Sequence, residues 1–151
     1  MSENLSILYI IFAFFSLGVT LGLFTRGQKY HAYFTYIPST FASFLTIILS
    51  VTIFSSEDIH LTFFNIQHLF DFEIFIDGVA AFFLLIIGLI SFAVSIYSLS
   101  YSKKFDDKKN NSALGMLFNV FIISMILVVI SNNVFFFLVF WELMSLTSFF
   151  L

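Results

Sequence analysis

Five long apolar runs constrain the fold of this chain more than any other feature of its sequence. They cover about residues 5–24, 33–54, 78–101, 114–130 and 134–151. A helix needs about 20 consecutive apolar residues to cross the ~30 Å hydrocarbon core of a bilayer, and every backbone polar group inside that core has to be paired internally. The runs therefore predict an all-α, polytopic membrane protein with five transmembrane helices in a single membrane domain, residues 1–151.

The composition agrees with this class and narrows the possible chemistry. Hydrophobic residues make up 60% of the chain and charged residues 10%, whereas soluble domains average about 45–50% and 25%. There is no cysteine to hold an iron–sulfur cluster, and no basic face that would bind nucleic acid. The histidines, His31, His60 and His68, lie in or beside connecting segments, so no pair is available inside the bilayer to hold a haem. We expect no cofactor, no metal and no redox centre in this chain.

The basic residues predict how the helices are oriented in the membrane. All six lie in two connecting segments: Arg26 and Lys29 follow the first run, and Lys103, Lys104, Lys108 and Lys109 follow the third. Two alternate loops share one side of the membrane, and the positive-inside rule assigns that side to the cytoplasm. We therefore expect a basic cytoplasmic loop at 102–111, an acidic external loop at 55–76 and an external amino terminus.

Several local patterns predict structure at the ends of these spans. Leu69 to Ile74 alternate between apolar and polar residues, which is typical of a half-buried strand, and we expect a short hairpin on the bilayer surface. Asp77 and Asn133 precede the third and fifth spans and are expected to cap their helices. The acids of the loop are consistent either with collection of protons or cations or with a solvated loop. The first apolar run has no basic residue before it and no small-residue cleavage site after it, so we expect a retained helix and not a signal peptide.

Small residues recur at helical spacing on three spans. They are Gly18 and Gly22; Ser39, Ser43, Thr46 and Ser50; and Gly88, Ser91, Ser95, Ser98 and Ser102. Small residues allow neighbouring helices to approach closely, and close packing is the favoured interpretation of all three faces. A specific dimer seam at the first face and a water-lined path along the other two are the alternatives.

The last apolar run carries a carboxylate, Glu142. If Asn133 caps this helix, Glu142 lies about 13–14 Å along its axis, close to the bilayer midplane. An ionised acidic side chain costs about 2.5–3.5 kcal/mol there on insertion scales, so the group can take up and release a proton within the membrane. Ser145 lies one turn further along the same face and could hydrogen-bond to the carboxylate or hold a water beside it. The runs contain no Lys or Arg, so a Lys that switches the carboxylate has to come from beyond Leu151.

Two stretches carry a resemblance to a known family. Phe70 to Tyr101 contains Asp-Gly at the start of a span that ends in Tyr-Ser-Leu-Ser-Tyr, and Ser131 to Leu151 contains Asn-Asn followed by Trp-Glu-Leu-Met-Ser-Leu. This combination resembles the amino-terminal part of the antiporter-like membrane subunits of energy-converting complexes. The family includes the proton-pumping subunits of respiratory complex I, the large membrane subunits of group-4 hydrogenases and formate hydrogenlyase, and subunits of multisubunit sodium/proton antiporters.

The resemblance implies a longer protein and a function. Subunits of this family have about fourteen helices, an external amino terminus and two inverted five-helix repeats, so we expect this chain to be the front part of such a fold. The Glu of the Trp-Glu motif works with a Lys on a later broken helix to pass protons, and here that Glu is Glu142. The resemblance is strongest to the hydrogenase-type large subunit, with complex I as the runner-up.

The resemblance also implies partners and a location. We expect a proton-translocating subunit of a multisubunit oxidoreductase in the bacterial inner membrane, assembled with other membrane subunits and with peripheral redox subunits. The alternatives are a subunit of a sodium/proton antiporter and a non-conducting structural anchor in which Glu142 only holds a neighbour.

Overall fold

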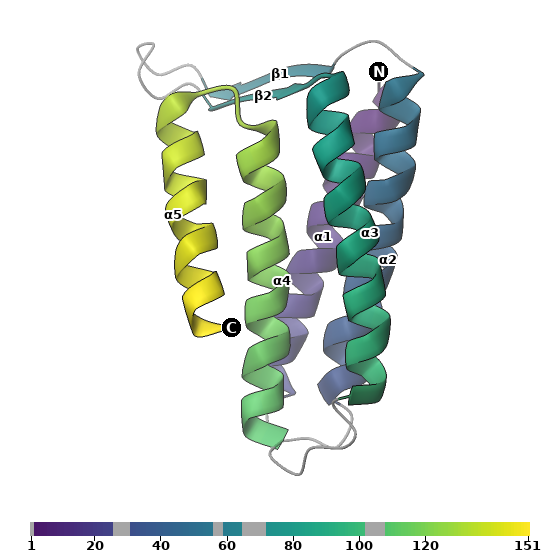
Figure 1. Cartoon of the computed structure of the whole chain (residues 1–151), viewed down its shortest axis with the longest axis vertical. Helices are drawn as coiled ribbons and strands as arrows, with labels where there is room; N and C mark the ends of the chain where they lie inside the picture. Colours follow the sequence, from purple (N-terminus) through teal and green to yellow (C-terminus); the bar gives the residue numbers. More distant parts are fainter. Residues whose placement is uncertain (1, 26–30, 56–58, 65–71, 102–107) are drawn as a thin grey trace.

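Five helices and a two-stranded hairpin make up the described part of the chain. The computed structural model describes residues 2–25, 31–55, 59–64, 72–101 and 108–151. The elements are α1 (Ser2–Phe24), α2 (His31–Phe54), β1 (Ile59–Phe64), β2 (Phe72–Ile76), α3 (Gly78–Tyr101), α4 (Lys108–Ile130) and α5 (Val134–Phe150). The helices stand side by side along the long axis, and the hairpin lies across the end that also holds the amino terminus (Figure 1).

The length and composition of the helices confirm an all-α, polytopic membrane protein. Four described segments are long and apolar enough to cross a membrane: Asn4–Phe24, Ala32–Phe54, Gly78–Tyr101 and Ser112–Ile130. The fifth helix, α5, is equally apolar but has 17 residues. At 1.5 Å per residue it is about 25 Å long, roughly one turn short of the hydrocarbon thickness.

Helix α4 starts earlier than its apolar run. It begins at Lys108, so the helix takes in the last part of the segment expected as the loop 102–111. Hydrocarbon thickness limits the apolar run and not the helix, because a helix pairs its own backbone groups in water as well as in lipid. The basic residues of 26–30 and 102–107, and the acids Glu57, Asp58 and Asp71, lie outside the described residues.

The expected hairpin is present and holds the start of α5. Strands β1 and β2 pair antiparallel, with Ile59 opposite Ile76, and both of these side chains are buried. Strand β2 is tied to the turn between α4 and α5: the Asn132 backbone N–H donates to the Glu73 carbonyl at 3.0 Å, and the Asn132 amide donates to the Glu73 carboxylate at 3.0 Å. The hairpin therefore fixes where α5 leaves this turn.

Both expected helix caps are confirmed. An oxygen of the Asp77 carboxylate accepts from the Ala80 backbone N–H at 2.7 Å, and the Asn133 side-chain oxygen accepts from the Phe135 backbone N–H at 2.8 Å. Each cap satisfies a backbone donor that the first turn of a helix leaves unpaired. The caps explain why α3 and α5 begin where the sequence predicts.

The small-residue faces of α2 and α3 pack against each other. A Cβ atom added at Gly88 would lie 3.2 Å from the Ile47 backbone nitrogen and 3.3 Å from the Ser43 carbonyl oxygen, so the two backbones are in near contact. The Ser43 and Ser91 hydroxyls donate within their own helices, to the Ser39 and Ile87 carbonyls at 2.8 and 2.7 Å. This geometry supports the packing interpretation of these faces, because hydroxyls paired in this way need no water.

Candidate functional site

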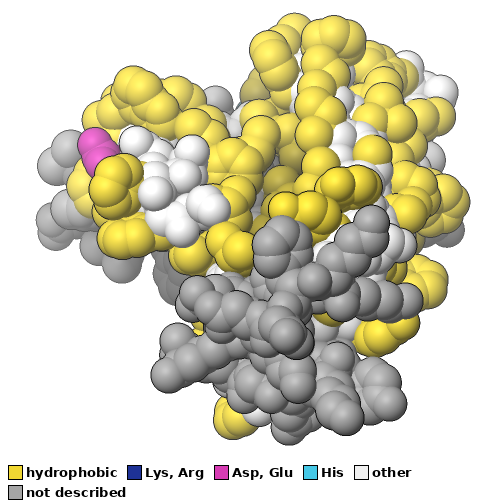
Figure 2. Space-filling model, turned by 60° about the horizontal axis from the view of Figure 1, so that its bottom comes forward, with side chains coloured by type: hydrophobic (Ala, Val, Ile, Leu, Met, Phe, Trp, Pro, Cys, Tyr) yellow, Lys and Arg dark blue, Asp and Glu magenta, His cyan; other side chains and the backbone are white. Residues whose placement is uncertain are grey.

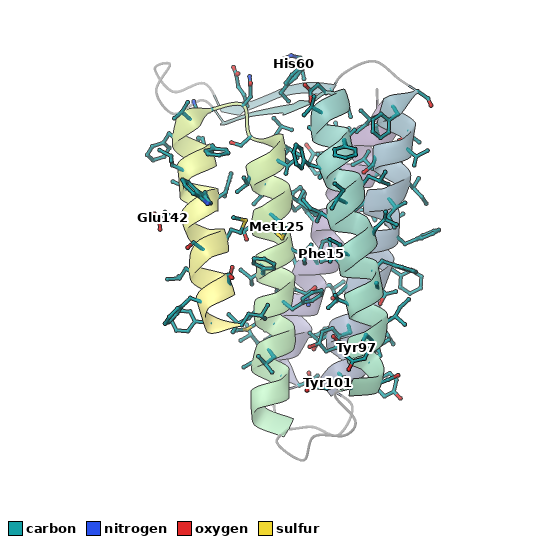
Figure 3. The ribbon with its side chains drawn as sticks, viewed as in Figure 1. Phe15, His60, Tyr97, Tyr101, Met125 and Glu142 are labelled. Carbon is teal, nitrogen blue, oxygen red and sulfur yellow. The ribbon has the colours of Figure 1, made fainter. Side chains whose placement is uncertain are left out.

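Glu142 lies on the face of α5 that points away from the other helices. Helix α5 packs chiefly against α4, and Thr147, which is 5% exposed, is its buried side chain. Glu142 is exposed, and its side chain extends outward from the bundle (Figure 3). Its position along α5 agrees with the sequence argument because Asn133 caps the helix nine residues earlier.

The surface around this carboxylate is apolar. The neighbouring side chains Leu138, Trp141 and Leu146 are 47%, 52% and 57% exposed, and the Phe137 ring packs beside Trp141 with centroids 6.2 Å apart. Among the described residues, the side chains of Glu142 and Ser145 have no partner for a hydrogen bond or an ion pair. The site is therefore a single ionisable side chain on an apolar helix face, and no described residue pairs with it.

Most of the described surface seen in Figure 2 is hydrophobic, and the acidic side-chain atoms visible in this view lie at its left edge. A surface of this kind is suited to lipid or to further apolar helices. An ionised carboxylate on a lipid-facing surface costs free energy, and carboxylates at such positions usually mark ion or proton pathways. The apolar runs of the described helices contain no Lys or Arg, so an ion pair with the Glu142 carboxylate would need a cation from elsewhere.

A second polar feature, buried within the bundle, was not predicted from the sequence. We call it the Asn119 cluster; it consists of Gly18, Thr35, Ser39, Gly115 and Asn119. The Ser39 hydroxyl donates to the Asn119 side-chain oxygen at 2.6 Å, and the Asn119 amide donates to the Gly115 carbonyl at 2.9 Å. Asn119 and Ser39 are both fully buried. The signal in the sequence was a lone amide inside the apolar run 114–130.

The Asn119 cluster joins three helices. A Cβ atom added at Gly18 would lie 2.8 Å from the Asn119 side-chain oxygen, so the glycine of α1 makes room for the amide of α4, while α2 supplies Ser39. A further hydrogen bond links α4 to α1, from the Ser112 hydroxyl to the Gly22 carbonyl at 2.6 Å. Because α5 packs against α4, these contacts also help to position the helix that contains Glu142.

We expect the hydrogen bond between Ser39 and Asn119 to be measurable by a double-mutant cycle. Asn119→Ala and Ser39→Ala should each lower the stability of the protein, and the double variant should lose less than the sum. The expected coupling is about 0.6 kcal/mol and at most about 1.7 kcal/mol, the range found for hydrogen bonds between membrane helices. Thermal unfolding of the purified protein in detergent measures it; strict additivity would contradict the hydrogen bond.

The fold and the site together define a multi-pass helical membrane protein with a carboxylate exposed at membrane depth. No family model matches the chain. Over 81 residues, 54% of this chain, it is 38% identical to hydrogenase-4 component B of Escherichia coli K12, of which the match covers 12%. Over 84 residues, 56% of the chain, it is 42% identical to NADH-ubiquinone oxidoreductase chain 5 of Paramecium tetraurelia, with 14% of that protein covered.

A third relative extends the same group. Over 78 residues, 52% of the chain, the identity is 38% to a subunit of the Na+/H+ antiporter of Alkalihalophilus pseudofirmus, with 9% of that protein covered. These similarities confirm the resemblance to antiporter-like membrane subunits that the motifs indicate. The matched segment spans only about a tenth of the length of these curated relatives.

Proposed function

We propose that this chain belongs to a proton-translocating membrane subunit of a multisubunit oxidoreductase, and that Glu142 is its proton relay. The observation that carries the proposal is the position of Glu142: nine residues past the Asn133 cap, exposed, and surrounded by apolar side chains. A structural carboxylate would be expected to hold a hydrogen bond inside the bundle, as Asn119 does. A relay instead has to face the group with which it exchanges the proton.

The chemistry of the relay follows from its surroundings. Placing a carboxylate in an apolar environment costs free energy unless a cation lies nearby. A Lys brought close to it favours the ion and releases the proton, and withdrawal of that Lys allows the carboxylate to be reloaded. The family resemblance supplies such a Lys from a later helix, beyond Leu151. The outward direction of Glu142 in Figure 3 leaves this side of α5 free to receive it.

The orientation in the membrane is part of the same proposal. The helix ends that flank the two basic segments lie at the end of the bundle opposite the hairpin (Figure 1). We assign that end to the cytoplasm by the positive-inside rule, in a bacterial inner membrane. The hairpin and the start of α5 then face outside, and the partners are other membrane subunits and peripheral redox subunits.

The function is tested with the complete protein, assembled in its complex and reconstituted into vesicles. A pH-sensitive dye in the vesicle lumen reports proton movement while the redox substrates of the complex are supplied. Proton movement that requires redox turnover supports the proposal. The antiporter similarity favours a second candidate: proton movement driven by a sodium gradient, without any redox substrate, would establish that candidate and overturn the first. Absence of proton movement under both conditions would leave the structural anchor.

A further inference from the structure

A cleft of about 450 Å³ lies at the hairpin end of the bundle. Its walls come from β2, the first turns of α3, the end of α4 and the first turn of α5. Its size falls within the range of about 300–1,000 Å³ that is typical of small-molecule sites. Because four elements enclose it, the cleft is a feature of the tertiary structure and not of one helix end.

The cleft changes from polar to apolar along its depth. Asp77, Ser131 and Asn132 border it at the level of the helix caps. Phe83, Val129 and Phe137 line it at the level of the transmembrane helices. Phe83 is five residues into α3, about 8 Å below the cap at 1.5 Å per residue. The cleft therefore combines a polar edge at the helix caps with an apolar lining.

The sequence beside the cleft is acidic. Residues 55–77 contain five carboxylates and no Lys or Arg; of the six basic residues, Lys108 and Lys109 begin α4 at its other end, and the other four lie outside the described residues. At the cleft itself, Asp77 is half-buried, and one of its carboxylate oxygens accepts a hydrogen bond from the Ala80 backbone N–H. On the adjoining strand, the Glu73 carboxylate accepts a hydrogen bond from the Asn132 amide. The carboxylates retain acceptor capacity beyond these bonds. A cationic hydrogen-bond donor above an apolar chain is complementary to both parts of the cleft.

We propose that this cleft binds an aminophospholipid of the outer leaflet, with its ammonium group at Asp77 and an acyl chain along Phe83, Val129 and Phe137. An aminophospholipid fits because it carries a cationic hydrogen-bond donor and an apolar chain, which match the carboxylate at the edge of the cleft and the apolar side chains that line it. Phosphatidylglycerol is disfavoured by its negative charge, and phosphatidylcholine has no N–H to donate. The site is independent of proton transfer at Glu142.

The test measures lipid retained by the delipidated full-length protein in its complex, by native mass spectrometry, with each of phosphatidylethanolamine, phosphatidylcholine and phosphatidylglycerol added at equal concentration. Phosphatidylethanolamine should be retained about tenfold more strongly than the other two, the effect of one charge-assisted hydrogen bond. Asp77→Asn should remove this preference, because Asn caps a helix as well as Asp does but carries no charge. Equal retention of all three lipids by the wild-type protein would overturn the proposal.

A second variant tests the contribution of the cleft to lipid binding separately from that of the headgroup contact at Asp77. Val79 borders the cleft and is 63% exposed, so Val79→Trp should fill the space and reduce retention of phosphatidylethanolamine to the level of phosphatidylcholine. Ala93→Trp, on an exposed position of the same helix, should retain the lipid as the wild-type protein does. If Val79→Trp retains phosphatidylethanolamine unchanged, or if a Lys of a partner subunit cross-links to Asp77 in the intact complex, the cleft is not a lipid site.

Discussion

Glu142→Gln is expected to abolish proton translocation while the protein still assembles and its partners still turn over their redox substrates. Gln has nearly the same shape and retains hydrogen-bonding capacity, but it cannot ionise. Glu142 lies outside the contact between α5 and α4, so its replacement should not disturb the packing of the bundle. The loss of a positioned proton carrier typically costs 10²–10⁴-fold in rate, and we expect a decrease of at least about 10²-fold in dye-reported proton movement.

The matched control places the same amide elsewhere on the same face. Leu146→Gln lies one turn further along α5 and is likewise exposed, so it tests the cost of an amide in this position without touching the carboxylate. It should assemble and pump. Glu142→Asp keeps an ionisable group and should retain part of the activity. Normal pumping with Gln at 142 would rule out the relay, and failure of Glu142→Gln to assemble, with Leu146→Gln intact, would favour the structural anchor.

Gly88→Leu is expected to have the largest effect on folding. The atoms nearest to an added Cβ include the Ile47 backbone nitrogen at 3.2 Å and the Ser43 carbonyl oxygen at 3.3 Å, and backbone atoms cannot move aside without separating α2 from α3. Over-packing typically costs about 1–3 kcal/mol and occasionally more. A larger side chain at a backbone contact lies at the upper end of that range, so little folded protein should accumulate.

Two further variants make this result interpretable. Gly88→Ala adds only the Cβ atom and should lower the midpoint of thermal unfolding while the protein still folds. Ala93→Leu introduces the same leucine on an exposed position of α3 and should leave the midpoint close to that of the wild-type protein. The measurement is thermal unfolding of the purified protein, with its yield by size-exclusion chromatography. A wild-type midpoint for Gly88→Leu would show that α2 and α3 are not in the close contact described.

Local signals were sufficient to predict several elements. The caps at Asp77 and Asn133 depend only on residues within the next three positions, and the distance of Glu142 from its cap along α5 follows from the helical rise. The alternation over residues 69–74 predicted a strand; the structure has β2 at Phe72–Ile76, and residues 69–71 lie outside the described residues. These predictions succeeded because capping and strand alternation are properties of short segments.

The orientation of Glu142 could not be predicted in the same way. Helix α5 is apolar on almost every side, so it has no hydrophobic stripe to indicate which face meets α4. Only the packing of Thr147 against α4 shows that Glu142 faces outward. The hydrogen-bond partners of Asn119 could not be predicted from the sequence either, because Ser39 is 80 residues away in the chain.

The sequence alone determined that this protein crosses the membrane repeatedly, and it predicts a carboxylate close to the bilayer midplane. It could do so because hydrocarbon thickness and helical rise are constants that act on each segment separately. Only the tertiary structure decided that Asn119 is enclosed by α1, α2 and α4, while Glu142 remains exposed on α5. That distinction depends on which helices pack together, and packing between apolar helices in lipid is decided by close contacts between distant residues and not by hydrophobicity.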